Sequence, residues 1–478
     1  MPSAVRSASP RLIGITKLTN CRLVRGDDLV WGDVWVSSTT GKIIRSQSAF
    51  YDELTMPDEV IDLGGRIVSP GFIECQLNGA YGFNFSTLVD DMTQYGKQLR
   101  SLNKRLVQTG VTSYIPTVTS QTSHLYKKVL PFLGPSGSSR RADDGAESLG
   151  AHVEGPFLNP TKNGVHNRSV LRVASSLADL EDMYGVANIT PSSFQSSPPS
   201  PSSTPTDATT PTTPTSPPSE IPIKMITVAP ELGTMANLIS ELTSRGILVS
   251  IGHSEATYEE ASAAVSAGAT MITHLFNAMR PLHHRDPGIF GVLGATEPAP
   301  QLQPEPQQSQ QQPQKRPYFG LIADGIHLHP ATVKIAWRAH PAGLVLVTDA
   351  MHMVGLPDGR YEWTNGEGEH YIVKRGSVLE LEGTGVIAGS SITLIDCISN
   401  FLTYTGATIP QALCAVTSTP AAMLGVAGVK GSLEAGADAD LVVLSEKEEE
   451  GEGGGDRREL VVDEVWKFGV RVFERGRD

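Results

Sequence analysis

Four apolar runs in this sequence end in a side chain that can bind a metal ion or move a proton. They are Leu149–Glu154, Leu248–His253, Thr270–His274 and Leu344–Asp349. Gly155 and a proline stop the first run, because proline cannot donate to a strand ladder and biases its predecessor toward extended geometry. In a parallel α/β fold the chemistry lies at the carboxyl ends of the strands. We therefore expect the four end residues to form one ring.

The types of these end residues suit a catalytic divalent metal. One carboxylate and two imidazoles, from Glu154, His253 and His274, form a ligand set that leaves one position open for water. A single histidine is more often a hydrogen-bonded structural group, so the interpretation depends on the three occurring together. Asp349 has two interpretations: it is a helix N-cap in the next loop, or a general base beside a water whose pKa a metal lowers toward about 7.

The elements that must position these residues begin near residue 67, where apolar runs start to alternate with helical patterns. Candidate strands lie at 68–75, 112–118, 149–154, 225–229, 248–253, 271–275, 318–324 and 344–349. Helices are expected over Leu88–Gln108, after the capping box at Thr257–Glu260, and from Pro330 onward. Eight strands with helices between them predict a (β/α)₈ barrel, and no GxGxxG motif follows the first strand to favour an open dinucleotide-binding sheet.

The two ends of the chain have a different, strand-rich pattern. Short β-type runs lie at 12–18, 33–36, 42–44, 440–444 and 464–473. With 478 residues the chain exceeds what one hydrophobic core usually supports. We therefore predict an α/β fold in two domains: a TIM-like barrel at 67–424, and a small β-sandwich that residues 1–66 and 425–478 build together.

Three tracts of low complexity interrupt these domains. Residues 191–219 have 25 Pro, Ser or Thr in 29 positions and residues 298–314 have 13 Gln or Pro in 17, so neither can bury a core. Both tracts follow an expected helix and precede an expected strand, which puts them at the barrel face away from the chemistry. We expect both inserts to be disordered and dispensable for catalysis. The Glu/Gly-rich tract 446–456 is expected to be a solvated loop.

Composition and charge exclude several classes of partner. A formal net charge of -13 argues against nucleic acid, since phosphate binding needs a basic surface, but it is compatible with a small anion held by local cations. No run has the apolar length of a membrane span, and the first dozen residues lack an apolar signal core. The four cysteines form no CxxC pair, which suits a reducing compartment. We expect no membrane partner and a cytoplasmic location.

Taken in order, the motifs around these residues resemble the metal-dependent amidohydrolases, and within them the family that deacetylates N-acetylglucosamine 6-phosphate. The matching segments are 70–79, 152–160, 252–254, 273–279, 283–288, 323–327, 346–350 and 388–390. Each segment is weak evidence alone, whereas their order along nearly the whole chain is specific. The resemblance implies hydrolysis of N-acetyl-D-glucosamine 6-phosphate to D-glucosamine 6-phosphate and acetate.

The resemblance also implies roles for individual residues. Glu154, His253 and His274 would bind one divalent metal ion per subunit, with zinc as the first candidate and iron, cobalt and manganese as alternatives. Asp349 would be the catalytic acid and base. His166 would polarise the acetamide carbonyl or help to seat the substrate.

Further residues would contact the phosphorylated amino sugar. His327 would contact a sugar hydroxyl, and Asn277 and Ala278 would contact the phosphate. Arg285 resembles an arginine that reaches the phosphate bound by a neighbouring subunit, which implies a homodimer. From the sequence alone, the interpretation of Arg285 as an ordinary surface cation has equal weight.

One departure from the wider superfamily concerns the first barrel strand. Many amidohydrolases carry His-x-His there, which helps to hold a second metal, whereas this chain has Gln76 and Asn78 in those places. Amides are poorer zinc ligands than imidazoles. We therefore predict one tightly held metal, with Gln76 and Asn78 as substitutes at the second-metal position.

Two other functions stay open at this point. A different amidohydrolase, acting on a cyclic amide or an amidine, could use the same metal ligands. The chain could also be a non-catalytic relative whose Pro-rich inserts bind partner proteins.

Overall fold

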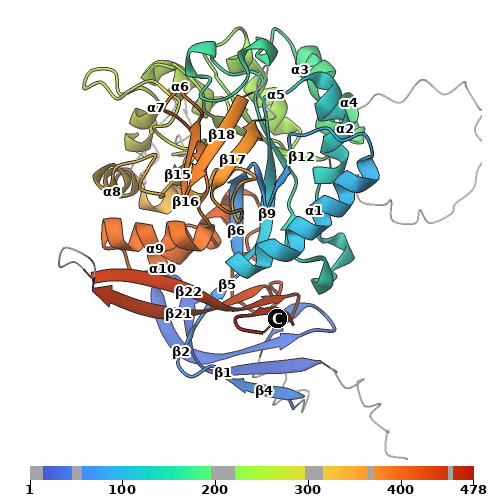
Figure 1. The fold of residues 1–478 in the computed structure, drawn as a ribbon, viewed down its shortest axis with the longest axis vertical. Coiled ribbons are helices and arrows are strands. Elements are labelled where there is room, and N and C mark those ends of the chain that lie inside the picture. Colours follow the sequence, from blue (N-terminus) through green and yellow to red (C-terminus); the bar gives the residue numbers. More distant parts are fainter. Residues whose placement is uncertain are drawn as a thin grey trace, which may run out of the picture.

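The computed structural model describes residues 14–45, 56–194, 221–295, 316–363, 370–450 and 456–477. Within these residues the chain forms a barrel of parallel strands, a separate sheet built from both ends of the chain, and a small antiparallel sheet beside the barrel (Figure 1). This arrangement confirms the predicted barrel with a small terminal β domain. The division into two domains at 66/67 and 424/425 stays a prediction.

Eight strands form the barrel. They are β6 (Phe72–Leu77), β9 (Val111–Thr119), β11 (Ala151–Glu154), β12 (Ile223–Val228), β13 (Leu248–Ile251), β14 (Met271–Ile272), β15 (Tyr318–Ile322) and β16 (Leu344–Val347). Neighbouring strands pair in parallel from β6 through β9 to β16. The last strand returns to the first, because the amide of Asp349 donates to the carbonyl of Gln76 at 2.9 Å and Leu77 bridges Ala350. All carboxyl ends therefore meet at one face.

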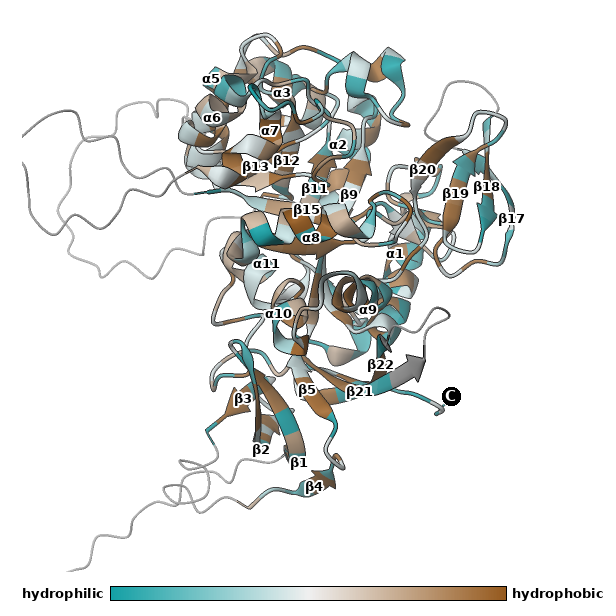
Figure 2. Cartoon of the chain, turned by 90° about the vertical axis from the view of Figure 1, so that its left-hand side faces the viewer, coloured by the Kyte–Doolittle hydropathy of each residue, from teal (hydrophilic) through white to brown (hydrophobic). Residues whose placement is uncertain are grey.

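Helices cover the outside of the barrel, as expected for strands that are apolar on both faces. They are α1 (Met92–Leu106), α2 (Ser123–Leu133), α3 (Leu177–Tyr184), α4 (Val186–Ile189), α5 (Met235–Ser244), α6 (Tyr258–Ser266), α7 (Gly288–Gly291), α8 (Pro330–Ala339), α9 (Leu394–Thr405), α10 (Ile409–Cys414) and α11 (Ser418–Met423). In Figure 2 the barrel strands are coloured mainly as hydrophobic, while their helices also present polar residues. The predicted capping box of Thr257 and Glu260 starts α6, and Pro330 starts α8.

The two ends of the chain share one sheet. Its strands are β1 (Ile15–Arg25), β2 (Asp28–Ser37), β3 (Lys42–Ile44), β4 (Glu59–Asp62), β5 (Ile67–Pro70), β21 (Leu441–Glu450), β22 (Asp456–Lys467) and β23 (Val470–Glu474). β21 and β22 lie between the barrel and the N-terminal strands (Figure 1). Apolar side chains from both halves, such as Val36 and Val443, pack in one cluster.

Two predictions about this sheet are wrong in detail. The run at 68–75 is two strands: β5 pairs with β21 in the terminal sheet, and β6 enters the barrel after Gly71. A Cβ at Gly71 would lie 2.1 Å from Thr112 Oγ1, so only glycine permits this close crossing. The tract 446–456 is not a loop throughout, because Glu446–Glu450 pairs with Leu460–Asp456 and only residues 451–455 lie outside the described chain.

A four-stranded antiparallel sheet, which the sequence patterns did not predict, follows the last barrel strand. We call it the flap; its strands are β17 (Gly359–Trp363), β18 (His370–Arg375), β19 (Val378–Leu381) and β20 (Val386–Ser390). The flap stands at the side of the barrel in Figure 2. It is joined to the carboxyl end of β16, because the amide of Met351 donates to the carbonyl of Ser390 at 2.9 Å. Three two-residue strands, β7 (Gly79–Ala80), β8 (Phe83–Asn84) and β10 (Glu147–Ser148), complete the described strands.

The two long inserts fall mostly on residues 195–220 and 296–315, which lie outside the described chain. Their described flanks lead from helical segments to the starts of β12 and β15, as predicted. Among the helices within the described ranges, none is both long enough and apolar enough to cross a bilayer.

Candidate active site

The four predicted strand-end residues lie together at the carboxyl face of the barrel. Glu154 is the last residue of β11, while His253, His274 and Asp349 each come two residues after a strand. These last three have φ values of 48°, 26° and 49°, in the left-handed region that side chains other than glycine and asparagine rarely adopt. The surrounding barrel therefore holds three of the four in strained backbone, which is typical of a functional site.

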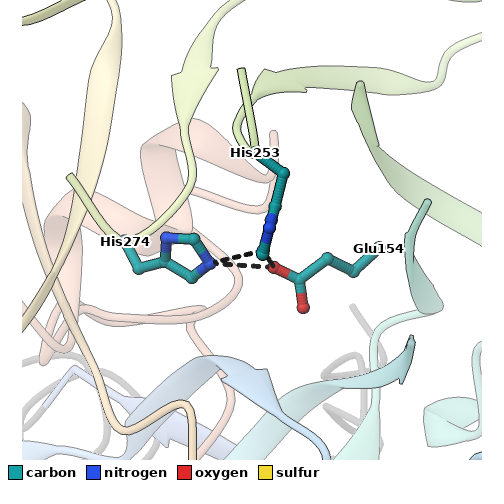
Figure 3. A group of neighbouring side chains, drawn as sticks. All are labelled: Glu154, His253 and His274. Carbon is teal, nitrogen blue, oxygen red and sulfur yellow. Dashed lines mark hydrogen bonds and ion pairs between the residues drawn. The ribbon is translucent and has the colours of Figure 1, made fainter. Parts of the chain in front are cut away.

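Three of these side chains point at a common centre (Figure 3). The Nε2 atom of His274 lies 3.0 Å from Glu154 Oε1 and 3.1 Å from His253 Nε2, and His253 Nε2 lies 3.3 Å from the same carboxylate oxygen. Ligand atoms at 2.0 to 2.2 Å from a tetrahedral zinc lie about 3.3 Å from one another. The spacing of the three atoms therefore fits one small divalent ion between them.

The hydrogen bond at the far side of His253 supports the same fit. Its Nδ1 atom lies 2.7 Å from the backbone carbonyl of Lys162, which can only accept. Nδ1 must therefore carry the proton, and Nε2 presents a lone pair to the centre, as a metal ligand requires. The side-chain amide of Gln76 donates to the same Glu154 Oε1 at 3.1 Å, and so helps to fix the orientation of this carboxylate.

The centre is also short of positive charge. Glu154 is buried and Asp349 is half-buried, and the described lining of the cavity places no lysine or arginine beside them. Burial alone would raise the pKa of Glu154, but contacts with His253 and His274 outweigh it and hold that pKa well below its usual range. A buried and a half-buried carboxylate without a lysine or arginine in contact favour a divalent ion between them.

Asp349 lies next to this centre and is held by one hydrogen bond. The side-chain amide of Asn78 donates to Asp349 Oδ1 at 2.7 Å, and the Asn78 oxygen has no partner within the described chain. Burial, reinforced by the negative charge of Glu154, raises the pKa of Asp349 to about 6. A carboxyl group with such a pKa can both take and return a proton near neutral pH.

His166 faces the same centre from the loop after β11. Its Nε2 atom lies 3.9 Å from Glu154 Oε2, and its Nδ1 accepts a hydrogen bond from the backbone amide of Ser120 at 3.2 Å. Burial lowers the pKa of His166 to about 3, so the ring is neutral. Nδ1 also lies 2.8 Å from Ser120 Oγ, so Ser120 holds this side of the ring and Nε2 is the nitrogen that faces Glu154.

A cavity of about 210 Å³ connects these groups. Nine of the predicted site residues line it: Asn78, Glu154, His166, His253, His274, Asn277, Ala278, His327 and Asp349. His327 Nδ1 donates to Asp324 Oδ2 at 2.6 Å, which leaves its Nε2 as a hydrogen-bond acceptor. Ala278 has a φ of 50°, so the backbone turns sharply beside His274 at the cavity wall.

Two predicted residues do not reach the cavity within the described chain. Gln76 is outside the described cavity lining and contacts Glu154 through its side-chain amide. Arg285 is exposed on the loop after β14, with its Nη1 2.9 Å from His284 Nε2, and it is absent from the described residues that line the cavity. In a single chain, this leaves the cavity without an arginine or lysine in its described lining.

Sequence reasoning missed several other residues of the lining. They are Thr119, Ser120, Gly164, Val165, Met351, Trp363, Ile387 and Gly389. Ser120 directly follows the second barrel strand and could have been found by the same strand-end rule. Trp363 and Ile387 come from the flap, whose only signal was the Ala-Gly-Ser motif at 388–390.

Comparison with known proteins agrees with this geometry. The amidohydrolase family profile matches residues 67–471. N-acetylglucosamine-6-phosphate deacetylase of Danio rerio is 40% identical over 90% of this chain and 93% of its own length. The enzyme of that name from Homo sapiens is 38% identical over 90% and 92%, respectively. A crystal structure of N-acetylglucosamine-6-phosphate deacetylase from Pasteurella multocida is 23% identical, covers 96% of this chain and 99% of its own, and has a TM-score of 0.70, which shows a shared fold. The chain therefore belongs to the amidohydrolase family, and within it to the N-acetylglucosamine-6-phosphate deacetylases.

Proposed function

We propose that this protein hydrolyses N-acetyl-D-glucosamine 6-phosphate to D-glucosamine 6-phosphate and acetate. The single observation that carries the proposal is the meeting of Glu154, His253 and His274 at 3.0 to 3.3 Å, with Asp349 in the same cavity. Relatives that carry this activity in their names span about nine tenths of the chain. The metal ligands, the proton donor and a cavity for a small substrate are what amide hydrolysis requires.

In this proposal Glu154, His253 and His274 hold one divalent ion per subunit. When bound, such an ion supplies Lewis acidity, which polarises the amide carbonyl and lowers the pKa of a coordinated water toward about 7. Two nitrogen ligands and one carboxylate favour zinc first, with iron, cobalt and manganese as alternatives. Gln76 and Asn78 direct their amide N–H groups at Glu154 and Asp349, so they neutralise part of the carboxylate charge that a second ion would otherwise balance.

Asp349 moves the proton of the reaction. It takes a proton from the attacking water and returns it to the departing nitrogen, because an amide does not readily release an unprotonated amine. Its raised pKa suits both steps. The hydrogen bond from Asn78 occupies Oδ1, which leaves Oδ2 for the proton transfer.

His166 donates to the carbonyl oxygen as that oxygen becomes negative. Ser120 contacts Nδ1 through its amide and its hydroxyl, so the ring is oriented with Nε2 toward the centre before the reaction starts. A neutral donor suits this role, because a charged imidazolium there would repel the metal ion.

The rest of the cavity binds the sugar. His327 Nε2 accepts from a sugar hydroxyl, since Asp324 fixes the proton on Nδ1. Asn277 and Ala278 contact the phosphate at the left-handed turn after His274.

We further propose that the active unit is a homodimer. The described lining of the cavity contains no arginine or lysine, while Arg285 is exposed and lies outside that lining. Arg285 of a second subunit would supply the missing charge. The four cysteines are all free thiols, which suits a cytoplasmic enzyme.

The decisive experiment measures acetate release from N-acetylglucosamine 6-phosphate. Turnover is expected with the purified protein, to disappear after chelation and to return on addition of zinc. The unphosphorylated sugar and a cyclic amide are measured beside it and are expected to react far more slowly. Hydrolysis of the cyclic amide alone would indicate a different amidohydrolase, and a protein without bound metal and without any hydrolysis would indicate a non-catalytic relative.

A further inference from the structure

The cavity next to Glu154 has two chemically different parts. The barrel strand ends contribute imidazoles, carboxylates, hydroxyls and amides. The other part is apolar and consists of Val165, Met351, Trp363 and Ile387, which we call the apolar wall. Neither the catalytic roles nor the phosphate contacts proposed above use it.

The apolar wall is assembled from three segments around the flap. Met351 and Trp363 share one hydrophobic cluster, against which Val165 packs, and they are only 2% and 5% exposed. Gly389 allows the flap to approach, since a Cβ there would lie 2.7 Å from Met351 Cγ. The wall is therefore fixed in position by packing.

The wall is also tied to the residues that act on the amide. Val165 directly precedes His166, and Met351 comes two residues after Asp349. All of these residues line one cavity of about 210 Å³, so a group placed against the wall shares that cavity with His166 and Asp349.

The substrate of the proposed function, on which this inference rests, has one terminal apolar group. That group is the acetyl methyl, and it is bonded to the carbonyl carbon under attack. Ala278, the remaining apolar side chain of the described lining, belongs to the turn that we assign to the phosphate. We infer that the apolar wall is the acyl pocket, and that it sets the length of acyl chain that the enzyme accepts.

The test is a series of substrates that differ only in the acyl group: N-formyl, N-acetyl and N-propionyl glucosamine 6-phosphate. One methylene in a hydrophobic pocket changes kcat/KM by about 10-fold to 200-fold. The unchanged protein is expected to prefer acetyl to both neighbours by about tenfold or more. Ile387 is 39% exposed at the cavity, so Ile387→Ala shortens the wall without leaving a buried void. In this variant the propionyl-to-acetyl ratio of kcat/KM should rise by about tenfold.

Two further variants make the result specific. Val386 is the neighbour on β20, is 43% exposed and lies outside the described cavity lining, so Val386→Ala should keep the ratio of the unchanged protein. Trp363→Phe replaces a buried side chain of the wall by a smaller one. This variant should also raise the propionyl-to-acetyl ratio of kcat/KM.

The outcomes separate this inference from the proposed function. Unaltered ratios in both Ile387→Ala and Trp363→Phe overturn the acyl pocket, as does an equal loss for all three substrates, which would assign the wall to the sugar ring. If the unchanged protein hydrolyses none of the three, the proposed function fails and the inference falls with it.

Discussion

Two clusters of carboxylates in this molecule are compensated in different ways. The first is the site of Glu154 and Asp349. The second, which we call the structural charge cluster, consists of Glu147, Asp438, Asp440, Lys430 and Lys467. Each cluster contains three groups that could in principle hold a metal ion. They differ in where their positive charge comes from.

The structural charge cluster is neutralised by the chain itself. Lys467 Nζ lies 2.5 Å from Glu147 and 2.7 Å from Asp440, and Lys430 contacts Glu147, Asp440 and Asp438. Asp438 also pairs with two more cations, one of which, on Arg140, lies at 2.9 Å. The cluster joins the barrel to the terminal sheet. Its lysine nitrogens supply the positive charge that a bound ion would otherwise supply.

At the site, by contrast, the carboxylates lie beside imidazoles and amides, and the described lining of the cavity contains no lysine or arginine. A buried carboxylate without a cation is unfavourable, so this cluster can recruit an ion from solution. The comparison teaches that carboxylate count alone does not identify a metal site. The presence or absence of lysine within contact distance decides between structure and catalysis.

The largest expected effect separates proton transfer from metal binding within the site. Asp349→Asn keeps the shape of the side chain but removes its basicity, so acetate release should fall about 1,000-fold or more. Metal content, measured by elemental analysis, should stay at one ion per subunit. A variant that retains a near-normal rate would show that another group moves the proton.

The next effect concerns the structural charge cluster. Lys430→Met leaves Glu147 and Asp440 with less compensation in a buried place, and should lower the free energy of unfolding by about 3 to 5 kcal/mol. Urea unfolding measures this, with Lys128→Met at the exposed surface as the control, expected within about 0.5 kcal/mol of the unchanged protein. The folded Lys430→Met protein should keep its metal and its turnover. Loss of metal without loss of stability would reverse the assignment of the two clusters.

A smaller effect distinguishes the two side-chain amides, of Gln76 and Asn78, that donate to the carboxylates of the site. Gln76→Met removes the donor to Glu154 and should weaken metal binding by about 10-fold to 100-fold, as loss of an outer hydrogen bond does in other metal sites. Asn78→Leu removes the donor to Asp349 and should lower kcat, with metal affinity close to normal. Competition with a chelator measures the affinity. Equal changes of affinity in the two variants would contradict this division.

The smallest effect is the response of the structural charge cluster to acid. Burial raises the pKa of Asp438 and Asp440, but nearby cations more than offset it and hold both pKa values below the ordinary range: Lys430, Lys42 and Arg140 act on Asp438, and Lys467 and Lys430 act on Asp440. Their contribution to stability is therefore complete above the unfolded pKa of about 3.9 and is lost as pH falls through the lower folded values. Below about pH 4 the unfolding free energy of the unchanged protein should fall more steeply than that of Asp438→Asn. Asp143 is exposed, so Asp143→Asn is the control. Parallel curves for the unchanged protein and Asp438→Asn, or an equally large difference with Asp143→Asn, would refute this.

The barrel and its ring of functional groups could be predicted because their signals are local. An apolar run, a stop at Gly155 and an acid or imidazole at its end are all visible within a few residues. Glu154 and His274 are 120 positions apart along the chain, yet each carries the same strand-end pattern.

The remaining features depend on contacts that no local pattern records. The break between β5 and β6 falls at Pro70 and Gly71, but that these two strands join different sheets is seen only in their pairing with β21 and β9. The flap strands are short and partly polar, and Trp363 becomes a cavity residue only when the flap packs on Met351. The structural charge cluster brings Glu147 to Lys467 across 320 positions of sequence.

The left-handed backbone at His253, His274 and Asp349 has a consequence for the engineering of this protein. Each position carries a strain of about 1 to 3 kcal/mol that glycine would relieve, although glycine offers neither a ligand nor a base. Selection for thermal stability alone would therefore favour glycine at these three positions and give a more stable barrel without activity. Only a screen that also requires turnover would retain these strained residues at the carboxyl face of the barrel.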